Sequence, residues 1–162
     1  MLKLSYSNGL LEAGIDEAGR GCLAGPVTAA AVILPENFSE PLLNDSKQIN
    51  EKTRYKLREI IEKEALAFTV CNVSNGEIDN INILNATYQA MNRCVLDLSL
   101  KPEFILIDGN RFKNESGIKH QCIIKGDSLF QSIAAASILA KTYRDDLMRE
   151  LHLIHPEYKW AK

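Results

Sequence analysis

The feature that most constrains the fold is a pair of strand-forming segments near the N-terminus, joined by a short glycine-rich link. Residues 10–17 and 22–34 each favour a strand, and the link between them predicts an antiparallel hairpin. The second segment contains the run 28–33, Thr-Ala-Ala-Ala-Val-Ile, which offers no strongly polar face. Because such a strand is covered on both sides, the run predicts a central strand with helices on both faces of the sheet.

Two adjacent carboxylates, Asp16 and Glu17, stand where the first predicted strand ends, and Gly19, Arg20 and Gly21 follow them. The glycines allow the backbone to come close to a large ligand. An arginine guanidinium matches the geometry of a phosphate group. The combination indicates a metal-dependent site for a phosphodiester. The alternative is a surface hairpin with ordinary charges, because glycines after polar residues are common in turns.

The other predicted elements complete an α/β domain. Helices are expected at 51–64, 74–81, 83–99 and 128–151, and further strands at 67–73, 104–108 and 120–124. Asn50 and Asp127 are well placed to cap the first and the last of these helices. Strands interleaved with helices predict a mixed sheet flanked by helices. The length fits one domain over residues 1–162.

Two more carboxylates lie at the ends of predicted elements: Asp108 ends the strand 104–108, and Asp127 precedes the last helix. Sites in open α/β sheets gather at strand ends, so we expect these two acids to converge with Asp16. Carboxylates this close repel one another unless cations or protons hold them. An all-oxygen donor set favours Mg²⁺ or Mn²⁺ over zinc. Glu17 joins the set only if the strand bends, because successive strand residues face opposite ways.

Composition bounds the setting of the protein. The formal net charge of −2 gives no overall basic field, so nucleic-acid binding would rest on a local patch. The four cysteines lack metal-ligand spacing and indicate reduced thiols of a cytosolic protein. No apolar run reaches the length of a membrane helix. The sequence therefore predicts a cytoplasmic globular protein.

Several short segments occur in an order and spacing that together are specific to one family. They are Gly14 to Gly21 with Ala24 to Val27, Asp45-Ser46-Lys47, Asp108-Gly109-Asn110, Lys125-Gly126-Asp127 with the run 132–141, and His155, Pro156, Tyr158 and Trp160. On these segments the chain resembles the ribonuclease HII family along nearly its whole length. The resemblance implies a ribonuclease H-like fold with a mixed five-stranded sheet.

The resemblance also implies an activity. Enzymes of this family cleave the RNA strand of RNA–DNA hybrids and incise 5′ to single ribonucleotides embedded in duplex DNA, as in ribonucleotide excision repair. The products carry a 5′-phosphate and a 3′-hydroxyl. The metal-binding acids would be Asp16, Glu17, Asp108 and Asp127, holding two Mg²⁺ or Mn²⁺ ions. One ion would generate the attacking hydroxide and the other would stabilise the leaving 3′ oxygen.

The substrate-binding residues that the resemblance implies are Gly19, Arg20, Gly21, Ser46, Lys47, Asn110 and Lys125. The glycine-arginine-glycine loop would read the ribose 2′-hydroxyl, the group that distinguishes RNA from DNA. The serine-lysine pair would contact a phosphate, and the last two residues would add contacts to the nucleic-acid backbone. The partners are then RNA–DNA hybrid and ribonucleotide-containing duplex DNA, bound by a monomer away from any membrane. Lys141, Arg144 and Arg149 are expected on a solvated helix face, with a DNA-backbone contact as the alternative.

Two other functions remain open at this stage. A ribonuclease HIII-like nuclease would carry an additional N-terminal substrate-binding domain, for which an acid motif beginning at Asp16 leaves no room. A catalytically weak nucleic-acid-binding module is the other alternative. The sequence stops at Lys162, before the tyrosine-bearing segment and C-terminal helices of the family. We therefore expect a catalytic domain that is short at its C-terminal end relative to the family.

Overall fold

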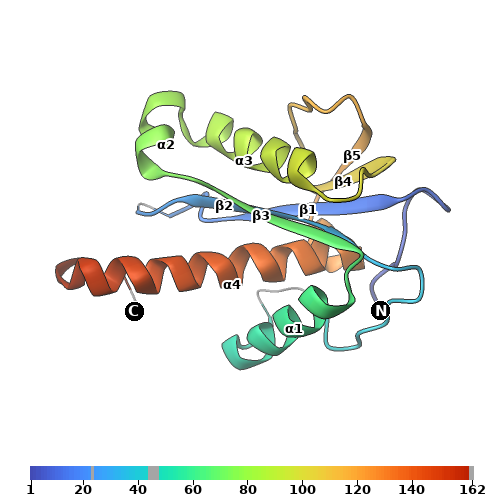
Figure 1. The fold of residues 1–162 in the computed structure, drawn as a ribbon, viewed down its shortest axis with the longest axis horizontal. Coiled ribbons are helices and arrows are strands. Elements are labelled where there is room, and N and C mark those ends of the chain that lie inside the picture. The colour runs from blue at the N-terminus through green and yellow to red at the C-terminus, as the bar shows by residue number, and fades with distance from the viewer. Residues whose placement is uncertain (23, 44–47, 161–162) are drawn as a thin grey trace.

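The computed structural model describes residues 1–22, 24–43 and 48–160. Its described part is a five-stranded sheet between two layers of helices (Figure 1). The strands are β1 (Glu12–Ala18), β2 (Val27–Ile33), β3 (Ala67–Val73), β4 (Phe104–Asp108) and β5 (Lys119–Ile123). The helices are α1 (Glu51–Glu64), α2 (Asn75–Ile81), α3 (Ile83–Asp97) and α4 (Gln131–Ile154), with one-turn 3₁₀ helices η1 (Gly126–Ser128) and η2 (Pro156–Tyr158).

The sheet is mixed, as the sequence predicts, and its strand order is β3-β2-β1-β4-β5. The hairpin strands β1 and β2 are antiparallel, and β3 continues that pattern on the far side of β2. On the other side, β1, β4 and β5 run parallel. All seven residues of β2 are buried, which confirms the central strand. The carboxyl ends of the three parallel strands consequently lie side by side at one end of the sheet.

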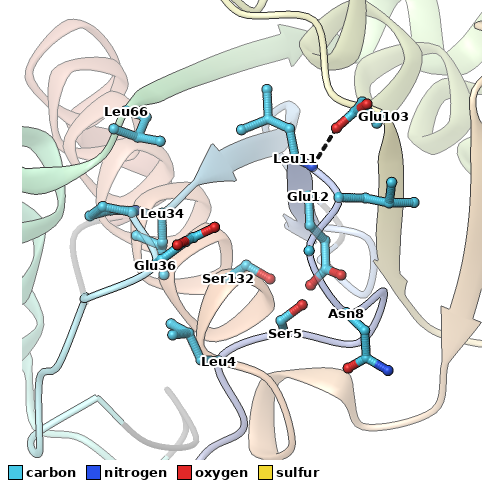
Figure 2. A pocket seen from close by; sticks show the side chains of 13 residues that line it. Leu4, Ser5, Asn8, Leu11, Glu12, Leu34, Glu36, Leu66, Glu103 and Ser132 are labelled. Carbon is cyan, nitrogen blue, oxygen red and sulfur yellow. Dashed lines mark hydrogen bonds between the residues drawn. The ribbon is translucent and has the colours of Figure 1, made fainter.

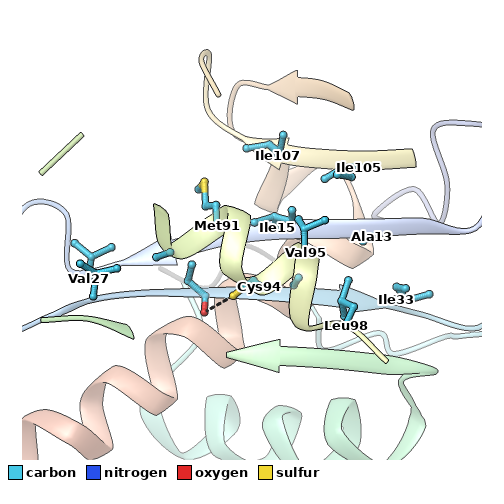
Figure 3. Close-up of a cluster of buried hydrophobic side chains, with 14 of the residues drawn as sticks. Ala13, Ile15, Val27, Ile33, Met91, Cys94, Val95, Leu98, Ile105 and Ile107 are labelled. Atoms are coloured by element: carbon cyan, nitrogen blue, oxygen red, sulfur yellow. Dashed lines mark hydrogen bonds between the residues drawn. The ribbon is translucent and has the colours of Figure 1, made fainter. Parts of the chain in front are cut away.

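The core has two layers, one on each face of the sheet. Figure 3 shows Met91, Cys94 and Val95 of α3, followed by Leu98, lying over β1, β2 and β4. Their i, i+3, i+4, i+7 spacing gives α3 its apolar face. On the opposite face, α1 and α4 pack side chains such as Leu57 against β2.

One position on β1 has no room for any side chain. A Cβ on Gly14 would lie 2.2 Å from the backbone carbonyl carbon of Ser132, near the start of α4. Glycine therefore permits β1 and α4 to cross in backbone contact. This close contact fixes the position of α4 along β1.

The prediction that Asp127 caps the last helix was wrong. Helix α4 begins at Gln131, and its N-cap position is Phe130, whose side chain makes no capping bond. Asp127 lies in η1, three residues before that position. The separate turn directs the chain from β5 into α4, so the acid stays at the end of the parallel strands. By contrast, the Asn50 side chain accepts a bond from the Thr53 N–H, as expected of an N-cap.

Two observations on the described residues concern the membrane and cysteine expectations from composition. Within them, no helix combines the length and the apolar character that crossing a bilayer requires. All four cysteines belong to the described residues, and each is a free thiol. The thiols differ in burial, because Cys94 is buried in the α3 layer and Cys22 is exposed.

Candidate active site

The four predicted acids lie where the parallel strands end. Asp16 and Glu17 are near the end of β1, and Asp108 is the last residue of β4. The register of these two parallel strands brings Asp108 next to Asp16. Asp127 follows β5 in η1. All four line one cavity of about 450 Å³, so the predicted convergence is present in the structure.

Burial, together with mutual repulsion of the carboxylates, governs the electrostatics of these acids. Asp16 is only 5% exposed. Burial, followed by the charges of Glu17 and Asp108, raises the pKa of Asp16 well above its usual range, and a hydrogen bond with Ser137 opposes the rise. Burial and Asp108 also raise the pKa of Glu17, against the lowering effect of Arg20. Such a group of carboxylates favours binding of protons or cations.

The Glu17 side chain does line the cavity. The alternation of strand residues alone does not predict this position. The Glu17 N–H donates to Oδ1 of Asp16 at 2.7 Å, although β1 is still paired with β2 at this residue. Its Oε2 is buried and has no hydrogen-bond partner. A buried oxygen without a donor, in a set of hard oxygen ligands, fits a divalent cation. Among the described residues, no three histidine, cysteine or acidic side chains already meet the geometry of a metal site.

The Gly19-Arg20-Gly21 loop forms a second wall of the same cavity. Gly19 has φ +94°, in the left-handed region that favours glycine, and a Cβ there would lie 2.6 Å from the carbonyl oxygen of Pro26. Gly21 has no other atoms within 4 Å of its Cβ position. The side chain of Arg20 is 53% exposed, and its nearest acid is Glu17, 3.9 Å away. The loop thus presents open backbone and a loosely held cation beside the acids.

Arg144 is the important residue that sequence reasoning placed wrongly. It is 6% exposed rather than solvated. Its Nε donates to the carbonyl of Pro26 at 3.0 Å and its Nη2 to the carbonyl of Ala24 at 2.7 Å. It also lines the cavity. No local signal in the sequence points to this burial, because the carbonyl partners are 118 and 120 residues away along the chain.

Substituting Arg144 by methionine should therefore disturb both stability and the loop. Two carbonyls would lose a charged donor, and we expect the free energy of unfolding to fall by about 2 kcal/mol. We also expect kcat/KM for a ribonucleotide-containing duplex to fall roughly ten- to hundredfold, because the loop loses its position. Chemical denaturation and steady-state kinetics measure the two effects.

The matched control for this change is Arg149→Met on the same helix. Arg149 is 46% exposed and forms ion pairs with Glu51 and Asp146. Its loss should cost less than about 1 kcal/mol and leave kcat/KM unchanged. Equal effects of the two substitutions would refute the assignment of Arg144 to the loop.

The remaining predicted site residues are placed less uniformly. Asn110 is exposed and lines a neighbouring cavity of about 330 Å³, which shares Glu17, Arg20 and Asp108 with the first. Lys125 is exposed immediately before η1 and lines neither cavity. Ser46 and Lys47 lie outside the described residues.

A mixed five-stranded sheet between helices, with acids at the ends of its parallel strands, is the arrangement of the ribonuclease H-like class of proteins. The profile of ribonuclease HII matches residues 13–162. The chain belongs to the ribonuclease HII family. Members of this family are ribonucleases H, which cleave the RNA strand of RNA–DNA hybrids, and the chain is accordingly an endoribonuclease.

Individual relatives agree with the family profile. Ribonuclease HII of Bacteroides thetaiotaomicron is 62% identical over 98% of this chain and 80% of that protein. The solved ribonuclease H2 of Pyrococcus horikoshii OT3 has 27% identity and a TM-score of 0.76, covering 88% of this chain and 75% of that one. Ribonuclease HII of Archaeoglobus fulgidus, solved as a complex with PCNA, has 28% identity and a TM-score of 0.76, covering 94% and 79%. These likenesses favour ribonuclease HII over the HIII alternative.

Proposed function

We propose that the chain hydrolyses the phosphodiester 5′ to a ribonucleotide, both in RNA–DNA hybrids and at single ribonucleotides in duplex DNA. The products would carry a 5′-phosphate and a 3′-hydroxyl. One observation carries the proposal: the four acids and the glycine-arginine-glycine loop line the same cavity. Cleavage chemistry and recognition of the ribose would then act on a single nucleotide.

Asp16, Glu17, Asp108 and Asp127 are the residues that would hold two Mg²⁺ or Mn²⁺ ions. The raised pKa values of Asp16 and Glu17 and the unpartnered Oε2 of Glu17 support this assignment, because each reflects a buried negative charge that its surroundings compensate incompletely. Bound divalent cations activate the attacking water and offset the charge that develops on the leaving 3′ oxygen. The side chains orient that chemistry by holding their oxygens on one side of the cavity.

The loop residues would position the substrate. Open backbone at Gly21 lets a sugar approach closely, and the ribose 2′-hydroxyl can both donate and accept hydrogen bonds. The Arg20 guanidinium makes a long contact to Glu17 and is otherwise without an ion pair to the described residues, so it is available for a phosphate. Arg144 keeps the loop in place from α4 through the carbonyls of Ala24 and Pro26.

Cleavage should depend on the divalent cation in a specific way. With a labelled duplex that contains one ribonucleotide, Mg²⁺ or Mn²⁺ should support incision. Ca²⁺, which accepts looser geometry, should support binding with little turnover. EDTA should stop the reaction, and an all-DNA duplex should stay intact. Binding without cleavage under every metal condition would favour the nucleic-acid-binding module, and full activity in EDTA would reject the metal site.

Arg20→Ala should weaken recognition of the ribonucleotide with little effect on folding. Loss of a charge-assisted contact predicts a roughly ten- to hundredfold lower kcat/KM for the single-ribonucleotide duplex. Because Arg20 is exposed, the free energy of unfolding should change by less than about 0.5 kcal/mol. Arg93→Ala is the control, since Arg93 forms a similarly exposed pair with Glu77 at 3.2 Å and lines neither cavity. A large loss of stability with normal kinetics would instead make Arg20 a structural ion-pair residue.

We propose that the protein acts as a monomer, which sedimentation at assay concentration tests. Residues 1–162 as one catalytic domain and a cytoplasmic location stay predictions. The complex with PCNA is that of the Archaeoglobus fulgidus protein, and we do not extend it to this chain.

A further inference from the structure

A second cavity lies at the end of the sheet away from the acids, and we name it the basal pocket. Its volume is about 510 Å³. It lies between the N-terminal segment, the start of β1, the residues after β2 and the residues before β3 and β4 (Figure 2). No residue of the described chain lines both the basal pocket and the acid cavity.

The walls of the basal pocket combine apolar side chains with negative charge. Leu4, Leu11, Leu34 and Leu66 contribute apolar surface. The charged side chains among its described lining residues are Glu12, Glu36 and Glu103, and no lysine, arginine or histidine accompanies them. None of these three glutamates forms an ion pair with another described residue. The pocket therefore offers an apolar lining and uncompensated negative charge to a ligand.

Two of the glutamates are fixed in place by backbone groups. Glu12 is 9% exposed and its Oε2 accepts from the N–H and the hydroxyl of Ser7, at 2.9 and 2.7 Å. Glu103 accepts from the N–H of Leu11 at 2.8 Å. These bonds hold the carboxylates at the pocket without neutralising their charge. The third, Glu36, is exposed at the rim.

An independent observation comes from Ser132 on α4. This residue is 3% exposed, and its hydroxyl oxygen is buried without a hydrogen-bond partner. Figure 2 shows its side chain directed into the space that Leu34, Glu36 and Glu12 surround. Buried polar groups are nearly always paired, so an unpaired hydroxyl in a pocket wall indicates a missing polar partner.

We propose that the basal pocket binds a small organic cation, a primary ammonium on an aliphatic body. An ammonium group has three donors and no acceptor, which matches carboxylates and a hydroxyl oxygen that lacks a donor. Its nitrogen lies between Glu12 and Glu36 and donates to the oxygen of Ser132. The aliphatic part packs against the leucines. The pocket, at about 510 Å³, is large enough for a ligand of this kind. An anion would instead be repelled by the three carboxylates.

Three probes of equal chain length and different charge test the proposal: hexylammonium, 1-hexanol and hexanoate. Binding is followed by amide chemical shifts of the folded full chain. We expect saturable binding of hexylammonium, with the largest shifts at the N–H groups of Ser7 and Leu11, which bond the pocket carboxylates. Hexanol should bind more weakly and hexanoate not at all. Equal binding of hexanol and hexylammonium, or no saturable binding, overturns the proposal.

Two variants locate the cation. Glu36→Gln should weaken hexylammonium binding roughly two- to fivefold, as expected for one exposed charge pair. Glu59→Gln is the matched control, because Glu59 is an exposed carboxylate on α1 that does not line the pocket. Ser132→Ala should raise the melting temperature of the ligand-free protein and weaken hexylammonium binding. Identical affinities of the two glutamine variants, or full affinity of Ser132→Ala, overturn the proposal. Cleavage of the single-ribonucleotide duplex should be unchanged in all three, which separates this test from that of the nuclease.

Discussion

Asp16→Asn is expected to abolish cleavage of a ribonucleotide-containing duplex while the protein stays folded. Asp16 lines the acid cavity together with Glu17 and Asp108, and the substitution would remove a carboxylate from the proposed metal site. We expect kcat to fall by about a thousandfold or more, which corresponds to roughly 4 kcal/mol of lost transition-state stabilisation. Single-turnover cleavage in Mg²⁺ measures the effect, with the exposed Asp79→Asn on α2 as control.

The same substitution should stabilise the metal-free protein at neutral pH. Burial and neighbouring charges raise the pKa of Asp16 in the folded state above the value of about 3.9 expected when unfolded. The folded carboxyl therefore binds its proton more tightly than the unfolded one, and wild-type stability is lost as pH rises through the raised pKa. The advantage of the asparagine variant should shrink as pH falls and Asp16 becomes protonated. Near-normal cleavage, or a melting temperature well below wild type at pH 7, would contradict our assignment of Asp16.

Gly14→Ala is expected to cause the largest loss of stability of any single methyl addition discussed. The new Cβ would lie 2.2 Å from the carbonyl carbon and 2.5 Å from the carbonyl oxygen of Ser132, and both are backbone atoms that cannot rotate away. β1 and α4 would have to separate, disturbing both core layers. We expect the free energy of unfolding to fall by at least about 3 kcal/mol.

Chemical denaturation of Gly14→Ala should be compared with that of Gly76→Ala. Gly76 lies within α2, and the nearest atom to its added Cβ is 3.9 Å away. That alanine should stabilise the protein by about 0.5–1 kcal/mol, because glycine is a poor helix former. If both variants denature alike, the close crossing of β1 and α4 is not a constraint on this chain.

Features set by local pattern were predictable from the sequence. The apolar run of β2 requires cover on both faces, and the structure buries all seven of its residues. Asp16 and Asp108 lie at or near the ends of predicted strands. Because sites form at strand ends, the sequence predicted that these two acids lie close together. Assignment of these acids to metal binding stays a prediction, since the described residues contain no completed metal site.

Features set by contacts distant in sequence were not predictable. Asp127 precedes a helix and looks locally like a cap, but η1 intervenes because the chain must turn from β5 toward α4. Arg144 looks like one of several cations on a helix, and its burial depends on carbonyls 118 and 120 residues away in sequence. No pattern within one helix specifies such a partner. The basal pocket likewise depends on five segments that only the fold brings together.

The length of α4 has a consequence for how this chain can change. Within one helix, Ser132 crosses β1, Ser137 bonds to Asp16, and Arg144 holds the loop that contains Arg20. Each added or deleted residue rotates everything beyond it by about 100° around the helix axis. An insertion or deletion between Ser132 and Arg144 would therefore turn at least one of these groups away from its partner. The number of residues between the crossing and the loop is thus fixed by the sheet beneath this stretch.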